Sequence, residues 1–498
     1  MDPQSLPAQI VAQLKEREPP RLATADILFL IKERALENMR HTTAGEVCFL
    51  VAVLAVAYIV MLIINRTLLG SALQVKRLTI PAFFMAIYVV LMSLPSIVWF
   101  YASPKDPVRY TYFMAMQVPL VAFPLGMFFA NALLGGVAYS AAVVTRFVSA
   151  PLERTEDDRY AVRYWLLMFG LSVLVAGVYL MTSSYVPLLG AFTSYGEEAP
   201  QMVRRAIVAE GVAIHYGHAL TARLLLPFCL LYSYFMAYQW GGRWRLLFWP
   251  TLGVAAFVSA LTFDRMFPFS VVLYLVLAIY FKYEDQAARA EVAGLAPRKR
   301  MSKLKLVGYV GALLAVAMLV GGIVSLTQFN KAMDLEIIWV TSSDFLFNRV
   351  LLDPSFMAWI YFEEFNVADK LLMGTGIHVL ISRAMGWEFY ATISPSFVAE
   401  LWVNFGWYGV TIGSMLVGFV LQLIQVRVFD RKTVPSLSLF IIMALNGAWV
   451  VYGHLLATMV ISVYLPSILI VAHLKRRRKA AALAAQRIAS HKLNVAHQ

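Results

Sequence analysis

Apolar residues follow one another along this chain in long blocks that short polar segments separate. The blocks cover 46–65, 80–101, 110–145, 164–186, 219–240, 246–263, 266–282, 306–327, 396–426, 436–452 and 455–473. Most are about 18–25 residues long, which is the length of an α-helix that crosses a bilayer. We therefore expect an all-α polytopic membrane protein with 11 or 12 transmembrane helices.

The block 110–145 leaves the number of spans open, because it is too long for one comfortable crossing. A single tilted helix there gives 11 spans and an external N-terminus. A fold-back near Pro124-Leu125-Gly126 gives 12 spans and an internal N-terminus. The second reading is favoured by the basic residues of the N-terminal arm, which are Lys15, Arg17, Arg21, Lys32, Arg34 and Arg40. In the same arm, 26–39 has the pattern of a helix lying on the membrane surface.

Loop charges orient the chain in the membrane. Basic residues recur in 146–163, 241–245, 283–305 and 427–435, and in a tail that begins Lys475-Arg476-Arg477-Arg478-Lys479. The positive-inside rule places these segments in the cytoplasm, so that 187–218 and 328–395 face outside. The expected order is a cytoplasmic or interfacial arm (1–45), helices with the external loop 187–218 (46–327), a large external loop with short helices (328–395), the last three helices (396–473) and a basic tail (474–498).

Composition narrows the class further. Of the 498 residues, 60% are hydrophobic and only 14% are charged, whereas soluble domains carry roughly 25% charged residues. A soluble enzyme, a disordered protein and a disulfide scaffold are therefore excluded. Cys48 and Cys229 lie inside apolar blocks and are expected to be small buried hydrophobes. The net charge of +13 gathers at the ends of apolar blocks, so membrane lipids are expected as partners and nucleic acid is not.

Arginines mark the outer ends of several spans. Arg223 lies a few residues into its apolar block, Asp264 and Arg265 fall at an external turn, and Arg349 and Arg383 lie in the long loop. A guanidinium group donates two hydrogen bonds at once and suits phosphate oxygens. For any single arginine, a snorkelling or salt-bridged role is the simpler alternative. Several external arginines together favour an anion site.

One acidic residue stands inside the span that follows the long loop. Ser396, Glu400 and Asn404 are four apart and share a helical face. A carboxylate in an apolar helix is costly unless it is paired or faces a wet cavity. Glu400 is therefore expected to point into the bundle and to act as a proton acceptor, with a structural pairing to an arginine as an equal alternative. His378 and His454 are further candidates for proton transfer.

Aromatic residues and glycines complete the picture of this region. Aromatic faces suit sugar rings, but packing is the favoured role for any single ring in the long loop. These rings are Phe345, Phe347, Phe356, Trp359, Tyr361, Phe362 and Phe365. Gly406 and Gly409 are expected to allow close contact between helices. No external His, Asp or Glu cluster has metal-ligand spacing, so neither a metal nor another cofactor is expected.

The run Pro395…Glu400…Asn404-Phe405-Gly406-Trp407-Tyr408-Gly409 resembles a segment of the bacterial Wzy-type O-antigen polymerases, which join oligosaccharide repeat units. In those proteins a similar run follows a large periplasmic loop. The segment Ala260-Leu261-Thr262-Phe263-Asp264-Arg265 is similar to another family feature, an arginine at the outer start of a span. In layout the resemblance covers about residues 260–473.

The resemblance implies a glycosyltransferase that polymerises undecaprenyl-diphosphate-linked repeat units at the periplasmic face of the inner membrane, without a metal, for surface or exopolysaccharide synthesis. It implies a chain-length-regulating co-polymerase and a flippase as partners. It also implies that the lipid diphosphate is held by Arg265 and Arg349, joined by Arg223 or Arg383. The implied base, or the residue that orients it, is Glu400, with His378 and His454 as fallback bases. The implied supporting residues of this site are Asp264, Ser396 and Asn404.

Three other functions stay open at this point. An O-antigen ligase-like enzyme would use the same donor with a different acceptor. A transporter or flippase for lipid-linked saccharides would carry charged groups and broken helices near the midplane in two related halves. Here the ionisable residues gather at the outer ends and the halves differ. A structural subunit of a secretion complex would require no convergence of arginines and an acid.

Overall fold

The computed structural model describes residues 37–39, 41–70, 72–73, 79–103, 107–154, 158–182, 217–261, 266–295, 353–364, 396–452, 455, 458–459 and 463–477, and the single residues 308, 311, 312 and 483. Within these residues every element is a helix and no strand occurs. Seven of the described helices are long and apolar enough to cross a membrane. The expected all-α polytopic membrane fold is confirmed.

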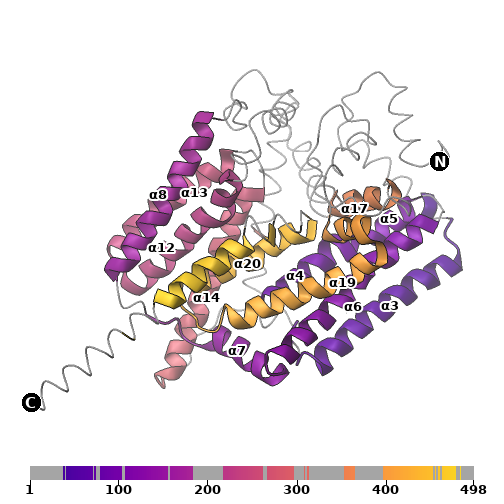
Figure 1. Cartoon of the computed structure of the whole chain (residues 1–498), viewed down its shortest axis with the longest axis horizontal. Coiled ribbons are helices and arrows are strands. Elements are labelled where there is room, and N and C mark those ends of the chain that lie inside the picture. Colours follow the sequence, from indigo (N-terminus) through magenta and orange to yellow (C-terminus); the bar gives the residue numbers. More distant parts are fainter. Residues whose placement is uncertain are drawn as a thin grey trace, which may run out of the picture.

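The helices follow the apolar blocks closely (Figure 1). The first part of the chain forms α3 (Ala44–Thr67), α4 (Ile80–Tyr88), the π-helical turn η2 (Val89–Ser93), α5 (Pro95–Ala102), α6 (Pro107–Leu133), α7 (Val137–Ser149) and α8 (Asp158–Thr182). The second part forms η3 (Thr221–Leu225), α12 (Leu226–Trp240), α13 (Arg243–Leu261), α14 (Met266–Val292), α17 (Asp353–Glu364), α19 (Phe397–Arg427), α20 (Val434–Tyr452) and a helix over 464–477.

Side chains at the starts of these helices explain where they begin. Thr43 and Glu46 form a reciprocal capping box at α3, and Thr79 caps α4 ahead of a proline in its first turn. Such caps satisfy backbone N–H groups that have no partner inside the helix. In the N-terminal arm, the described residues 37–39, which include Asn38 and Met39, are helical. The rest of the surface helix expected over 26–39 lies outside the described residues.

The block 110–145 forms two helices that meet at a glycine pair. α6 continues through Pro119 and Pro124 as far as Leu133, so the expected fold-back at Pro124-Leu125-Gly126 is wrong. The chain turns instead at Gly135 and Gly136, whose φ angles of 102° and 99° suit glycine alone. Prolines are tolerated inside membrane helices because neighbouring groups satisfy the freed backbone. α7, with 13 residues, is too short to cross back.

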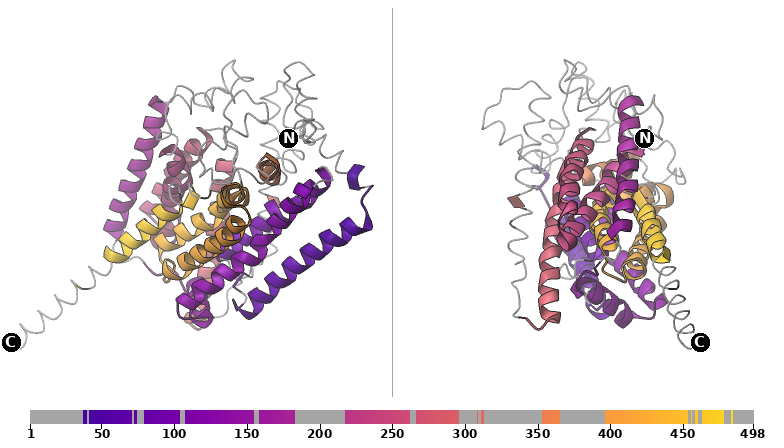
Figure 2. Two further views of the ribbon diagram at one scale, coloured as in Figure 1. Left: turned by 45° about the vertical axis from the view of Figure 1, so that its right-hand side comes forward. Right: turned by 90° about the vertical axis from the view of Figure 1, so that its left-hand side faces the viewer.

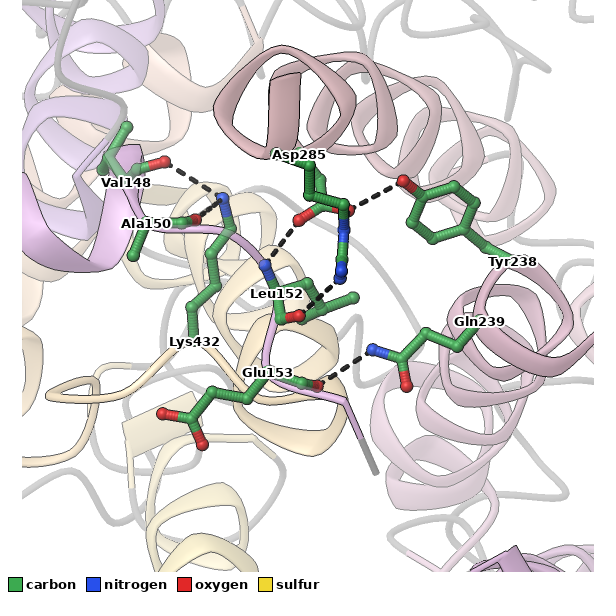
Figure 3. Close-up of polar contacts among 9 residues, drawn as sticks. Val148, Ala150, Leu152, Glu153, Tyr238, Gln239, Asp285 and Lys432 are labelled. Atoms are coloured by element: carbon green, nitrogen blue, oxygen red, sulfur yellow. Dashed lines mark hydrogen bonds and ion pairs between the residues drawn. The ribbon is translucent and has the colours of Figure 1, made fainter. Parts of the chain in front are cut away.

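Segments with basic loops meet at one end of the bundle, which we call the Lys432 end (Figure 3). Lys432 Nζ donates to the carbonyl oxygens of Val148 and Ala150, each at 3.0 Å. Asp285 accepts from the backbone N–H of Leu152 and, at 2.7 Å, from the Tyr238 hydroxyl. These hydrogen bonds join four regions at one end of the bundle. They are the segments 146–163, 283–305 and 427–435, which were assigned to the cytoplasm by charge, and the end of α12 just before the fourth such segment, 241–245.

The opposite end, which we call the Glu400 end, is covered by α17 (Figure 1). Phe356 stacks on Trp99 of α5 with ring centroids 4.6 Å apart. The Tyr112 hydroxyl of α6 bonds to Ser355, with its donation to the Ser355 carbonyl at 2.9 Å. α17 belongs to the long segment 328–395, so the part of this segment that the structure describes is a short helix folded on the bundle.

The start of α3 also lies at the Glu400 end. Arg109 and Glu46 form an ion pair, and Asn38 Nδ2 donates to the Tyr101 carbonyl at 2.7 Å. The last residues of the arm and the long-loop helix therefore share one end, as in the 11-span reading.

α3 lies at the margin of the bundle beside α6 (Figure 2). Only 17% of its most apolar window is buried, and valine, isoleucine and leucine side chains cover its outer face. Cys48 is exposed on this helix, whereas Cys229 is buried in α12. The expectation of burial was therefore wrong for Cys48, because a helix at the edge of a membrane bundle turns apolar residues toward lipid.

Candidate functional site

Glu400 lies in the first turns of α19 and is held there by local bonds. The Ser396 hydroxyl caps the helix by accepting from the Ala399 N–H at 3.1 Å. One turn farther on, Asn404 Nδ2 donates to the Glu400 carbonyl at 2.7 Å. The carboxylate itself is partly buried and accepts through Oε2 from the Leu455 N–H at 2.9 Å. The acid is thus fixed between the start of α19 and the residues that follow α20.

A break at Gly406 separates the Glu400 turns from the rest of α19. Gly406 has φ 60° and ψ −142°, a conformation that L side chains rarely adopt. A Cβ on Gly409 would overlap the Leu401 carbonyl, and a Cβ on Gly413 would overlap the Leu401 side chain. Positions eight apart in a straight helix are separated by about 12 Å. Residues 397–405 therefore form a half-helix that folds back against the long half.

This arrangement gives the two glycines roles that differ from the expected contact between helices. Gly406 supplies the backbone turn, and the close neighbour of Gly409 belongs to the same element, eight residues earlier. The contact between different helices is made elsewhere, where Gly418 of α19 meets the backbone of Phe123 and Gly126 of α6 meets that of Met415. The half-helix 397–405 therefore continues, after the break, into a long half of α19 that packs tightly against α6.

Arg223 lies at the same end of the bundle on a π-helical turn. The turn η3 spans Thr221–Leu225, and such turns are frequent at functional sites. The guanidinium carbon lies 3.8 Å from the centroid of the Trp449 ring of α20. Arg223 also interacts electrostatically with Tyr274, whose hydroxyl accepts from Asn446 Nδ2 at 2.7 Å. The arginine is therefore stacked on α20 beside a small polar cluster.

Arg223 and Glu400 each contact a residue at or just beyond the end of α20. Arg223 stacks on the ring of Trp449, and Glu400 accepts from the N–H of Leu455. Thr458 approaches the Trp449 carbonyl at 3.5 Å. Arg223 and Glu400 are far apart in the sequence, yet both lie at the Glu400 end of the bundle, the arginine against Trp449 of α20 and the acid against Leu455.

Glu400, Trp449 and Leu455 lie inside a segment that matches a family model. Residues 393–471 match the family model of the O-antigen polysaccharide polymerase Wzy. The resemblance to the Wzy-type polymerases is confirmed. The Wzy match covers α19 and α20 and includes Glu400, Ser396 and Asn404, and it supports an O-antigen repeat-unit polymerase in general. No curated protein and no solved structure matches the chain.

The other expected site residues cannot be placed with the Wzy-matched acid. Asp264, Arg265, Arg349, Arg383, His378 and His454 all lie outside the residues that the structure describes, as do Phe345, Phe347 and Phe365. Of the candidate set, the structure places Glu400, Ser396, Asn404 and Arg223. Among the described residues, no group of three His, Cys, Asp or Glu side chains could hold a metal ion.

The described rings of the long loop pack on the bundle. Phe356, Trp359, Tyr361 and Phe362 of α17 are at most 3% exposed. Phe362 stacks on Trp402 of α19 with ring centroids 4.6 Å apart. The sequence could not reveal this stack, because the two residues belong to different elements and share no motif.

Proposed function

We propose that this chain polymerises undecaprenyl-diphosphate-linked oligosaccharide repeat units at the periplasmic face of the inner membrane, as a glycosyltransferase of surface or exopolysaccharide synthesis. The observation that carries the proposal is the setting of Glu400. This carboxylate lies in the Wzy-matched segment, on a half-helix at one end of an apolar bundle. It accepts from the N–H of Leu455, and Arg223 stacks on Trp449 near the end of α20 at the same end of the bundle.

In the proposed reaction, the glycan chain of one carrier lipid moves to a hydroxyl of the next lipid-linked unit. A bond forms between the anomeric carbon and the acceptor oxygen, and the bond from that carbon to the diphosphate oxygen breaks. Glu400 takes the proton of the acceptor hydroxyl, or orients the group that does, with His378 and His454 as the other bases. A base in this position raises the nucleophilicity of the acceptor as the bond forms.

The leaving diphosphate gains negative charge as its bond to the sugar breaks. Fixed cations placed where this charge develops lower the barrier without a metal. Arg223 is such a cation at the Glu400 end, and its planar group stays charged at any pH of interest. We propose that Arg265, Arg349 and Arg383 join it on the same diphosphate, with Asp264 orienting Arg265.

The distribution of basic segments supports the assignment of the two ends. The segments around 148–153, 285–289 and 432 meet at the Lys432 end. Since basic loops face the cytoplasm, the Glu400 end faces the periplasm. In the pathway we propose, a flippase delivers the lipid-linked units to that face and a co-polymerase sets the chain length.

The direct test is chain growth by the purified protein in lipid vesicles, with lipid-linked repeat unit as the only substrate. We expect long chains from the wild type, in the presence or absence of a chelator, and none from Glu400→Gln. Glu153→Gln is the matched control, because the Glu153 side chain is exposed at the other end. Long chains from Glu400→Gln would refute the role of the acid.

The same assay separates the alternatives. A ligase-like enzyme would join the glycan to an added acceptor but would not lengthen the lipid-linked unit. A transporter would move the unit across the vesicle membrane and leave its length unchanged. Chain growth without any further acceptor is therefore the outcome that the polymerase proposal requires.

A further inference from the structure

We infer that the half-helix of α19 holds a subsite for the hydroxyl groups of the acceptor sugar, in which Asn404 Oδ1 binds a hydroxyl next to the one that Glu400 activates. The inference rests on the proposed function and deepens it, because it names the part of the lipid-linked unit that binds here. Asn404 lies one turn after Glu400, and the two positions share a face of the half-helix.

The Asn404 amide is fixed by a bond to the backbone of Glu400. Its Nδ2 donates to the Glu400 carbonyl at 2.7 Å. The reverse orientation would set the amide oxygen against a carbonyl oxygen that cannot donate, so this bond decides which end of the amide is nitrogen. Oδ1 is therefore directed away from the Glu400 carbonyl. Asn404 is only 6% exposed, and none of the described residues donates a hydrogen bond to this oxygen.

Buried amide oxygens elsewhere in the bundle have donors. Asn131 Oδ1 accepts from Gln422 at 2.7 Å, and Gln117 Oε1 accepts from a serine hydroxyl at 2.7 Å. Among the Asn and Gln side chains that the structure describes, those of Asn404 and Asn446 alone have a buried oxygen without a donor, and both lie in the Wzy-matched segment. An unpaired buried acceptor destabilises a protein, so an oxygen left unpaired beside the acid indicates a donor on a ligand.

The groups around Glu400 and those around Arg223 select different parts of a lipid-linked unit. Asn404 Oδ1 and the Glu400 carboxylate are acceptors, so they attract hydroxyl groups and repel phosphate oxygens. The Arg223 guanidinium offers only donors and a positive charge, which suit the diphosphate. The half-helix therefore takes the sugar whose hydroxyl attacks, and the leaving diphosphate lies on the side of Arg223.

A sugar ring carries hydroxyl groups on neighbouring carbons and can therefore reach both acceptors. Positions four apart on a helix are separated by about 6 Å along its axis. The Glu400 side chain is partly exposed, whereas Asn404 is almost covered, so the shared face opens at the acid. One hydroxyl gives its proton to Glu400 as its oxygen attacks the anomeric carbon of the donor chain. A neighbouring hydroxyl donates to Asn404 Oδ1 and fixes the ring.

The test separates the two ends of the Asn404 amide. A serine side chain in a helix can bond back to the carbonyl four residues earlier, so Asn404→Ser keeps a donor on the Glu400 carbonyl and removes the projecting oxygen. Asn404→Thr bonds in the same way and is the second variant should serine unfold the protein. Ser414→Ala is the matched control, because it removes from the other half of α19 a buried hydroxyl that has no hydrogen-bond partner among the described residues.

Two probes are titrated into the purified protein by calorimetry. The free repeat-unit oligosaccharide, released from its carrier lipid, carries hydroxyl donors, whereas inorganic diphosphate offers mainly acceptor oxygens. We expect Asn404→Ser to raise the Kd of the oligosaccharide about five-fold, the effect of losing one hydrogen bond between neutral groups. The Kd of diphosphate should stay the same, and the thermal midpoint should not fall. Ser414→Ala should bind both probes as the wild type does.

The outcomes distinguish the inference from the proposed function. Wild-type affinity of Asn404→Ser for the oligosaccharide overturns the inference, because the oxygen then meets only water. An equal loss of affinity for both probes also overturns it, since displacement of the half-helix would explain the effect. Both results leave the proposed function standing. That function fails instead if Glu400→Gln makes long chains in the vesicle assay.

Discussion

The crossing of α6 and α19 predicts a stability difference between two chemically identical substitutions. A Cβ at Gly418 would lie closer than 3.0 Å to the carbonyl oxygen of Phe123, and real Cβ atoms essentially never approach that closely. The obstacle is backbone, so neither a rotamer change nor a side-chain shift relieves it. Gly418→Ala therefore forces the two helices apart. At Gly253 of α13, by contrast, a Cβ would meet nothing within 4 Å.

The magnitude follows from the comparison of Gly418→Ala with Gly253→Ala. Both variants gain the same helix propensity, roughly 1 kcal/mol for glycine to alanine. This gain cancels in the difference, which leaves the overpacking cost of about 1–3 kcal/mol. We expect Gly418→Ala to be less stable than Gly253→Ala by that amount, measured as the free energy of unfolding in mixed detergent micelles. Equal stabilities would refute the tight approach of α6 and α19.

Three further outcomes follow from the site and from the opposite end. Gly406→Ala should cost about 1–3 kcal/mol because its φ is positive, and should abolish chain growth in vesicles because the half-helix with Glu400 is displaced. Arg223→Lys should lower chain growth although the charge stays, because an ammonium group cannot stack flat on Trp449; wild-type rates would contradict a role for the planar group. Burial lowers the pKa of Lys432 to about 8, so between pH 8 and 10 the unfolded chain holds a proton that the folded chain has released. The free energy of unfolding should therefore rise by about 2–3 kcal/mol over this range. The same unfolding measurement on Lys432→Met should show no such rise.

The helices and the grouping of their ends were open to prediction from the sequence. In a bilayer, every backbone polar group must be bonded inside the segment, so a long apolar block has no alternative to a helix. Loop charge then sorts the ends, and the segments it assigned to the cytoplasm do meet around Lys432. The position of Glu400 near an end followed from the cost of burying a carboxylate.

The features that shape the site depend on tertiary contacts, and the sequence did not reveal them. Pro124 was expected to break a helix, yet α6 continues through it because the bundle supports the helix on several sides. Gly406 was expected to provide contact between helices, but its positive φ instead folds a half-helix back. Phe362 was one aromatic residue among several in a long loop, and only the folded bundle shows that it stacks on Trp402 of α19.

The arrangement of α19 suggests why the acid lies on a half-helix rather than on a continuous span. After the break, Gly418 allows the long half of α19 to pack directly against the backbone of α6, so this half has little freedom to tilt. Above the break, the half-helix is positioned by its own contacts, with α17 through Trp402 and with the stretch after α20 through Leu455. A continuous span would fix the direction of Glu400 by the rotation of the whole helix. The break at Gly406 allows α17 and the stretch after α20 to set that direction locally, at the end of the bundle where a lipid-linked glycan would arrive.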